Sequence, residues 1–321
     1  MAECATPVLF IVFNRCDTAL QVLAAIGAAR PKRLYVAADG PRSGRADERA
    51  ETEQVRQAIL AGIDWPCELK TLFQTENLGC RRGVVAAIDW FFENEAEGII
   101  LEDDVVPSPD FFRFCEYGLA RYRDDGRIFM ISGTNPLGAQ SPSSGYFYSS
   151  FGSIWGWASW RRAWAHYDVS MKGWPDSDMA RTLVRKHGRA CALYLASVLN
   201  NHVKYDLDTW DSQWLYAILK HGALTVVPAV NLVRNIGILG THSSVETRNH
   251  NLPYGHLLFP LRALSDCVEE NGCFRAELTR KLFLPAMLVS SASRIAKRFG
   301  LHALLVRVHG WLRAGKAARS R

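Results

Sequence analysis

Short apolar segments alternate with amphipathic segments through the first third of the chain, and this order constrains the fold more than any other feature. The expected strands are residues 7–13, 33–39, 67–74 and 98–104. The expected helices between them are residues 19–30, 45–62 and 81–95, the first with Asp17 or Thr18 as its N-cap. The order predicts an α/β fold with a mostly parallel sheet and helices on both faces. Ligands of such sheets bind beyond the carboxyl ends of the strands.

Composition places the chain among ordinary globular proteins, since 48% of its 321 residues are hydrophobic. The apolar run at residues 8–13 is too short for a signal sequence, and no run approaches the roughly 20 residues that span a bilayer. We therefore expect a cytoplasmic protein. Eight scattered cysteines without C-x-x-C spacing indicate reduced thiols, to which we assign no chemistry.

Positive charge is concentrated at the end of the sequence. After Glu277 the chain has ten Lys or Arg and no acid, so the whole-chain net charge of +6 leaves about −4 for the first 277 residues. Apolar residues recur at helical intervals among these basic residues. The pattern suits a helix on an anionic membrane surface and equally a solvated helix docked on its own domain. Nucleic acid is not expected as a partner, because no recognised binding module accompanies the charge.

Three consecutive acids, Glu102, Asp103 and Asp104, follow the fourth apolar strand in the segment "IILEDDVVPSPDFF". Adjacent carboxylates at the end of a buried strand repel one another, so a bound cation is the simplest reason for them. Strand alternation would point Glu102 and Asp104 to one face and Asp103 to the other. Oxygen ligands suit Mg²⁺ or Mn²⁺, which take one or two carboxylates together with substrate phosphates. The chain has neither G-x-G-x-x-G after the first strand nor a P-loop, so a nucleotide would be held differently.

Six segments together resemble a known group of enzymes, the nucleotide-sugar glycosyltransferases of GT-A fold. The likeness is to bacterial sugar transferases related to the N-acetylglucosaminyltransferase I family. The segments are "TPVLFIVFNRCDT", "AADGPR", "ENLGCRRGV", "ILEDDVVPSPDFF", "GSIWGWASWRRAW" and "NIGILGTHS", spread over most of residues 6–245.

The resemblance implies roles for residues at the ends of the strands. Asp104 would bind the metal, Glu102 and Asp103 would hold the ribose and the donor sugar, and Asp39 would read the nucleotide base. Further residues expected near the donor phosphates are Asn14, Arg15, Arg81 and Arg82. As ordinary structure, Asp39 would belong to the turn "ADGPR", whatever its function.

The second half of the sequence supplies candidates for the acceptor side. Inverting transfer needs a general base, and "WDSQW" resembles the family's arrangement with Asp211 in the matching place. Because Ser212 replaces a second acid, Asp208 or Asp206 remains an alternative, and Asp211 could instead cap the following helix. His242 is the expected late histidine at the metal. Seven of the ten tryptophans lie at residues 155–214, and Trp155 and Trp157, which flank Gly156, are the expected acceptor-binding pair.

The sequence therefore predicts a GT-A domain over residues 1–275 and a basic tail over residues 276–321. Residues 1–135 would bind the nucleotide sugar and residues 136–275 the acceptor. The expected activity is metal-dependent transfer, with inversion, of a sugar from a UDP-linked donor to a glycan or lipid-linked hydroxyl, with the tail on the inner membrane face. Two alternatives remain. A sugar-1-phosphate nucleotidylyltransferase would need a Gly-rich basic loop after the first strand, and a non-catalytic membrane-surface protein would bind no nucleotide.

Overall fold

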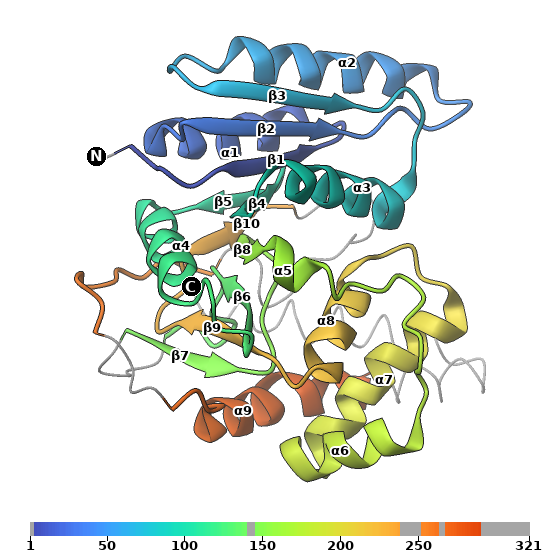
Figure 1. Ribbon diagram of the computed structural model, residues 1–321. Coiled ribbons are helices and arrows are strands. Elements are labelled where there is room, and N and C mark those ends of the chain that lie inside the picture. Colours follow the sequence, from blue (N-terminus) through green and yellow to red (C-terminus); the bar gives the residue numbers. More distant parts are fainter. Residues whose placement is uncertain (1–2, 140–144, 238–251, 263–266, 290–321) are drawn as a thin grey trace, which may run out of the picture. The chain divides into compact units, whose positions relative to one another are not determined.

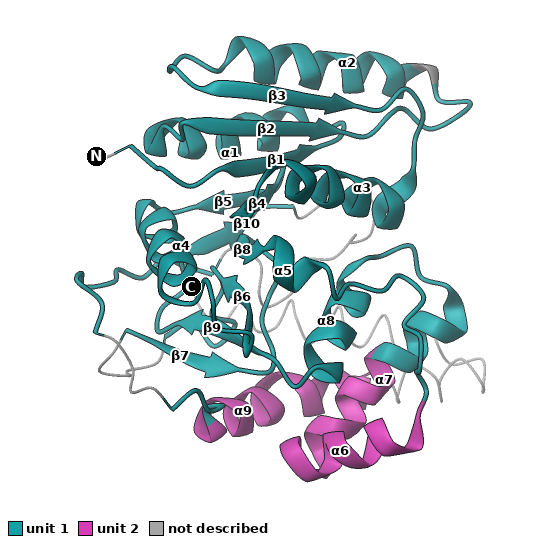
Figure 2. Cartoon of the chain, in the orientation of Figure 1, with its two compact units in different colours: residues 1–175, 199–271 teal, residues 176–198, 272–321 magenta. Residues whose placement is uncertain are grey.

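The computed structural model describes residues 3–139, 145–237, 252–262 and 267–289, which form two compact units. Unit 1 comprises residues 1–175 and 199–271, and unit 2 comprises residues 176–198 and 272–321 (Figure 2). The predicted boundary near residue 275 lies close to the second junction, but the segment 176–198 was not expected to belong with the end of the chain. His242 and residues 290–321 of the expected tail lie outside the described residues.

Unit 1 is built on an eight-stranded mixed sheet with the order β3-β2-β1-β4-β8-β6-β9-β7 (Figure 1). Its parallel half consists of β1 (Val8–Val12), β2 (Arg33–Ala38), β3 (Glu68–Phe73) and β4 (Glu97–Glu102). Its second half consists of β6 (Ile128–Ser132), β7 (Tyr146–Ser149), β8 (Trp157–Trp160) and β9 (Leu224–Pro228). β8 pairs antiparallel with both β4 and β6, so it joins the two halves into one sheet.

The helices of the first half follow the predicted order. They are α1 (Cys16–Ala29), α2 (Ala46–Ala61) and α3 (Gly79–Asn94). α1 and α2 pack together, while α3 packs on β1. Right-handed crossovers place α1 and α2 on one face and α3 on the other, because the chain reverses direction across the sheet after β3. The predicted N-cap of α1 was wrong: Arg15 holds that place, and both Asp17 and Thr18 lie in the first turn.

Shorter elements complete unit 1. They are β5 (Val105–Pro107), α4 (Pro109–Arg121), α5 (Arg161–Trp164), α8 (Asp211–Lys220) and β10 (Val233–Asn235). β10 pairs antiparallel with β5, directly after the acids. Unit 2 contains α6 (Ser177–His187), the first part of α7 (Arg189–Tyr205), α9 (Gly272–Leu278) and the π-helix η1 (Thr279–Phe283). No helix in the described ranges combines the length and apolarity needed to cross a bilayer.

The core of unit 1 explains most of the tryptophan density. The rings of Trp157, Trp164, Trp210 and Trp214 pack in stacked, tilted and edge-to-face pairs, with centroids 5.2–6.2 Å apart. This tryptophan cluster fixes the start of α8, because Trp210 is buried and immediately precedes Asp211. Aromatic side chains of this size contribute a large part of the apolar area buried on folding.

Candidate functional site

A cavity of about 360 Å³ lies at the carboxyl ends of β1, β2, β3 and β4. β1 stands between β2 and β4, so the chain order reverses beside it. Open α/β sheets bind ligands at such a switch point, because the loops that leave neighbouring strands diverge there. Of the predicted site residues, Arg15, Asp39, Glu102, Asp103, Asp104, Trp155 and Asp208 line this cavity.

The acids after β4 meet Arg15, which follows β1. Asp103 is buried, accepts a hydrogen bond from the Phe13 backbone N–H at 3.3 Å and forms an ion pair with Arg15. The same guanidinium lies 3.0 Å from Asp104 Oδ2. The expected division of the acids between two faces was wrong, because regular strand geometry ends at Glu102 and the turn after it brings Asp103 and Asp104 to one cation.

The pKa values of Glu102 and Asp103 are raised, although the positive charge of Arg15 opposes both rises. Burial, followed by the charges of Asp104 and Asp103, raises the pKa of Glu102 to about 8. Burial likewise raises the pKa of Asp103 to about 6, although Arg15 opposes that rise. Burial is the largest cause of both rises, and Arg15 opposes them without restoring either pKa to its ordinary value.

The segment after β10 closes the cavity beside Asp104. The Ile236 N–H donates to the Asp104 carbonyl oxygen at 2.8 Å, and the Gly237 N–H donates to Asn235 Oδ1 at 2.9 Å. Asn235 and Gly237 both line the cavity. The backbone of Gly237 passes so close to the acids that a Cβ there would lie 2.1 Å from Asp104 Oδ2. His242, the predicted additional metal ligand, lies five residues beyond this point and outside the described residues.

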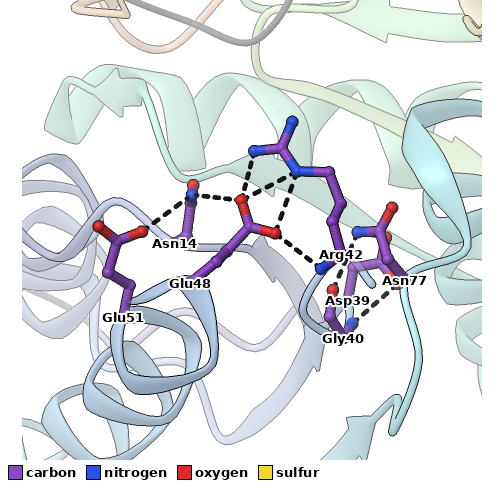
Figure 3. Close-up of polar contacts among 7 residues, drawn as sticks. All are labelled: Asn14, Asp39, Gly40, Arg42, Glu48, Glu51 and Asn77. Carbon is purple, nitrogen blue, oxygen red and sulfur yellow. Dashed lines mark hydrogen bonds and ion pairs between the residues drawn. The ribbon is translucent and has the colours of Figure 1, made fainter. Parts of the chain in front are cut away.

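Asp39 follows β2 and holds the turn that precedes α3. Its carboxylate accepts from the backbone N–H groups of Gly40, Leu78 and Gly79 and from the side-chain amide of Asn77, at 2.9–3.2 Å (Figure 3 shows Asp39, Gly40 and Asn77). Burial raises the pKa of Asp39, and these hydrogen bonds oppose the rise. Asp39 therefore has a structural role at the start of α3, which differs from the expected role within its own turn.

The three candidate bases differ in their contacts. Asp208 accepts from the N–H groups of Cys80 and Arg81, both at 3.0 Å, so its two oxygens cap the first turn of α3. Asp206 forms an ion pair with the Arg81 side chain at 2.8 Å. Asp211 is exposed, and its Oδ1 accepts from Thr209 Oγ1 and the Ser212 N–H. Asp211 also contributes to the raised pKa of Glu102, so its charge acts on the acid end of the cavity.

Of the remaining predicted residues, Trp155 lines the cavity, whereas Asn14, Arg81, Arg82 and Trp157 are not among its lining residues. Asn14 hydrogen-bonds Glu48 and Glu51 on α2, Arg81 points to Asp206, and Arg82 is exposed. Trp155 is half-buried and lines the cavity, as an acceptor-binding residue would. Trp157 is 0% exposed in the tryptophan cluster, so it offers no surface to an acceptor and packs the core instead.

Sequence analysis missed three polar residues of the cavity: Arg42, Gln74 and Asn235. Gln74 follows β3 as Asp39 follows β2, so the rule that selected strand ends could have selected it too. Arg42 and Asn235 gave no such signal, because their position depends on contacts with residues distant in the sequence.

Three comparisons relate this chain to known proteins. No protein-family model matches the chain, and no curated protein does. Among solved structures, the glycosyltransferase GlyE of Streptococcus pneumoniae TIGR4 matches at 11% identity and a TM-score of 0.34, over 70% of this chain and 45% of that one. The apo form of GlyE matches at 11% identity and a TM-score of 0.32, over 69% of this chain and 44% of that one. HddC of Yersinia pseudotuberculosis matches at 9% identity and a TM-score of 0.30, over 49% of this chain and 77% of that one. This chain thus spans less than half the length of GlyE.

Proposed function

We propose that this protein is a metal-dependent glycosyltransferase. It would transfer a sugar, with inversion, from a UDP-linked donor to a hydroxyl of a glycan or lipid-linked saccharide, as in surface polysaccharide assembly. The observation that supports this most is the group of three carboxylates and Arg15 at the switch point of the sheet, inside a cavity of about 360 Å³. Carboxylates in such a place suit a donor whose leaving group is itself a metal-binding diphosphate.

The acid end of the cavity suits a hard divalent cation that the protein holds only in part. Within the described residues, no group of three or more Asp, Glu, His or Cys side chains is placed to enclose an ion. Mg²⁺ and Mn²⁺ nevertheless bind at one or two carboxylates when substrate phosphates supply the other oxygens. Asp104 would be the principal ligand, because Asp103 is buried against Arg15 and Phe13. When bound, the ion would neutralise charge that develops on the departing diphosphate.

The remaining roles follow from the contacts of each side chain. Arg15 lies between the ends of β1 and β4, where its guanidinium can bind diphosphate oxygens and hold them in line with the sugar. Asp211 is favoured as the general base. Both oxygens of Asp208 are taken by α3 and Asp206 is paired with Arg81, whereas Asp211 Oδ2 has no partner among the described residues. Asp211 would accept the proton of the acceptor hydroxyl as the new bond forms.

Calorimetric titration of UDP and GDP, with and without Mn²⁺, tests the donor site. We expect Mn²⁺-dependent binding of UDP that is lost in Asp104→Ala and kept in Asp124→Ala, a matched change at an exposed acid. Absence of nucleotide binding to the native chain under every condition would refute the proposal. A nucleotidylyltransferase would instead release pyrophosphate from a nucleoside triphosphate and a sugar 1-phosphate, and the same protein can be assayed for that reaction.

Peripheral membrane binding through the basic end of the chain is a separate part of the proposal. Its support is the sequence, with ten basic residues and no acid after Glu277. Removal of residues 290–321 should abolish binding to vesicles that contain anionic lipid while nucleotide binding remains. Unchanged vesicle binding by the shortened chain would contradict this assignment.

A further inference from the structure

The cavity has two chemically different ends, and only one of them holds the acids. At the other end, the ends of β2 and β3 and the inner side of α3 provide an apolar wall of Ala37, Ala38, Leu72, Val84 and Ala87. A nucleoside diphosphate has the same division, with a flat base at one end and charge at the other. The inference below rests on the proposed function and concerns which residues recognise the base.

Asp39 lies at the apolar end but is already fully engaged. Four donors share its two oxygens: the Asn77 side-chain amide, the backbone N–H of Gly40 after β2, and the backbone N–H groups of Leu78 and Gly79 at the start of α3. If Asp39 turned toward a ligand, the start of α3 would lose those bonds, and unpaired N–H groups are costly where water is scarce. These contacts make Asp39 a residue that positions α3.

Gln74 lines the same cavity, and its side-chain amide can bind a ligand in place of the engaged Asp39 carboxylate. Its backbone N–H donates to the Ala38 carbonyl at 2.9 Å, and its carbonyl accepts from Arg56 Nη2 at 2.6 Å. Both backbone groups are therefore fixed, and only the side chain can serve a ligand. No partner for that side-chain amide occurs among the described residues, although Gln74 lines the cavity. An amide offers a donor and an acceptor side by side, which complements the adjacent C=O and N–H of a base edge.

Arg42 supplies a flat surface that lines the same cavity. Glu48, buried on α2, binds the Arg42 backbone N–H at 2.7 Å and Nε at 2.9 Å and also pairs with Nη2 (Figure 3). The guanidinium carbon lies 5.6 Å from the centre of the Phe13 ring. The guanidinium plane is thus fixed by one carboxylate and packed on one ring, at a position that lines the cavity.

We propose that Gln74 and Arg42 bind the nucleobase: the Gln74 amide hydrogen-bonds the edge of the base, and the Arg42 guanidinium, fixed by Glu48, stacks on its face. Asp39 then acts on the base only by holding α3. Planar stacking of a guanidinium on an aromatic base tolerates any base, whereas the amide discriminates between edges. Selectivity among nucleotides therefore depends mainly on Gln74, and general affinity for the base mainly on Arg42.

The test compares ligands that share the diphosphate and differ in the base. UDP, GDP and inorganic pyrophosphate are titrated with Mn²⁺ into the native chain and into Gln74→Ala, Arg42→Lys and Asp39→Asn. Arg49→Ala, an exposed arginine on α2, is the matched control. Gln74→Ala should lower UDP affinity roughly 3- to 10-fold and bring the UDP and GDP affinities together. Arg42→Lys keeps the charge but loses the plane, so both nucleotides should weaken by about 2- to 5-fold.

Pyrophosphate separates recognition of the base from damage to the site. Its affinity should stay within about 2-fold of the native value in Gln74→Ala and Arg42→Lys, because neither side chain belongs to the acid end. Asp39→Asn should lower the melting temperature while the ratio of UDP to GDP affinity stays unchanged. If only Asp39→Asn removes the difference between UDP and GDP affinity, or if Gln74→Ala keeps that difference, Gln74 does not select the base, while the proposed function stands. If the native chain binds neither nucleotide, the proposed function fails and this inference fails with it.

Discussion

Replacing Gly237 by alanine would place a methyl carbon 2.1 Å from Asp104 Oδ2 and 2.8 Å from its Cγ. Ordinary contacts begin at 3.4 Å, so the methyl group and the carboxylate must separate by ~1.3 Å. The backbone cannot readily supply that movement, because the Ile236 N–H is bonded to the Asp104 carbonyl and the Gly237 N–H to Asn235. The Asp104 side chain should therefore turn away, and its contact with Arg15 should be lost.

Two costs determine the size of the effect. A side chain displaced from its rotamer costs about 0.5–1.5 kcal/mol, and loss of a hydrogen bond to a charged group costs about 1.5–3 kcal/mol. Since Arg15 keeps its ion pair with Asp103, we expect the lower part of that sum, about 2–3 kcal/mol in the free energy of unfolding. Displaced metal ligands and their supporting groups typically cost 10- to 100-fold in affinity, so Mn²⁺-dependent UDP binding should fall by at least about 10-fold.

Calorimetry with UDP and Mn²⁺ and urea unfolding measure the two quantities on the same Gly237→Ala protein. The matched control is Gly126→Ala, because nothing lies within 4 Å of a Cβ built at Gly126. We expect the control to behave as the native chain. Affinity within 2-fold of native and unchanged stability in Gly237→Ala would mean that Asp104 has room to move without consequence, and the argument for it as the principal ligand would fail.

Asp208→Ala should lower the free energy of unfolding by about 1–2 kcal/mol, because it removes the side-chain cap from the N–H groups of Cys80 and Arg81. Asp211→Ala should cost less stability, because its hydrogen bonds are local and the residue is exposed, and should abolish transfer. Equal stability of the two variants in urea would contradict these roles. Burial lowers the pKa of His202, so below its ordinary value near 6.5 the unfolded chain binds more protons than the folded one. Stability should be complete above about pH 6.5 and decline as pH falls, and His202→Gln should weaken that decline in melting curves taken between pH 7.5 and 5.5. An identical pH dependence in the variant would show that His202 does not carry it.

The parallel half of the fold could be predicted from the sequence because each of its elements has a local sequence pattern. The observed β1, β2, β3 and β4 lie within the predicted ranges or begin one residue earlier, since buried apolar runs between polar turns are local features. The composition of unit 2 could not be predicted. Residues 176–198 and 272–289 belong to one compact unit although about 70 residues separate them, and no sequence pattern in either segment indicates that they pack together.

The candidate site divides in the same way. The position of the acids after β4 in a ligand cavity could be predicted, because three adjacent carboxylates are unfavourable without a ligand. Their geometry could not, since the strand ends at Glu102 and the next two side chains turn to Arg15. The capping roles of Asp39 and Asp208 depend on α3, whose first turn receives carboxylates from two remote parts of the chain. Such partners are set by tertiary structure, which a pattern of residue types does not specify.

The position of Arg15 also bears on the order in which ligands arrive. Its guanidinium already serves as an internal counterion for Asp103 and Asp104. A divalent ion that arrives alone must compete with that arginine for Asp104 and leaves the guanidinium short of partners. A diphosphate that arrives with the ion offers the guanidinium new oxygens, so each ligand should strengthen the binding of the other by the same factor. On the proposed function, the cavity would therefore bind free metal weakly and the metal-bound nucleotide strongly, and the complex, not the ion alone, would be its ligand.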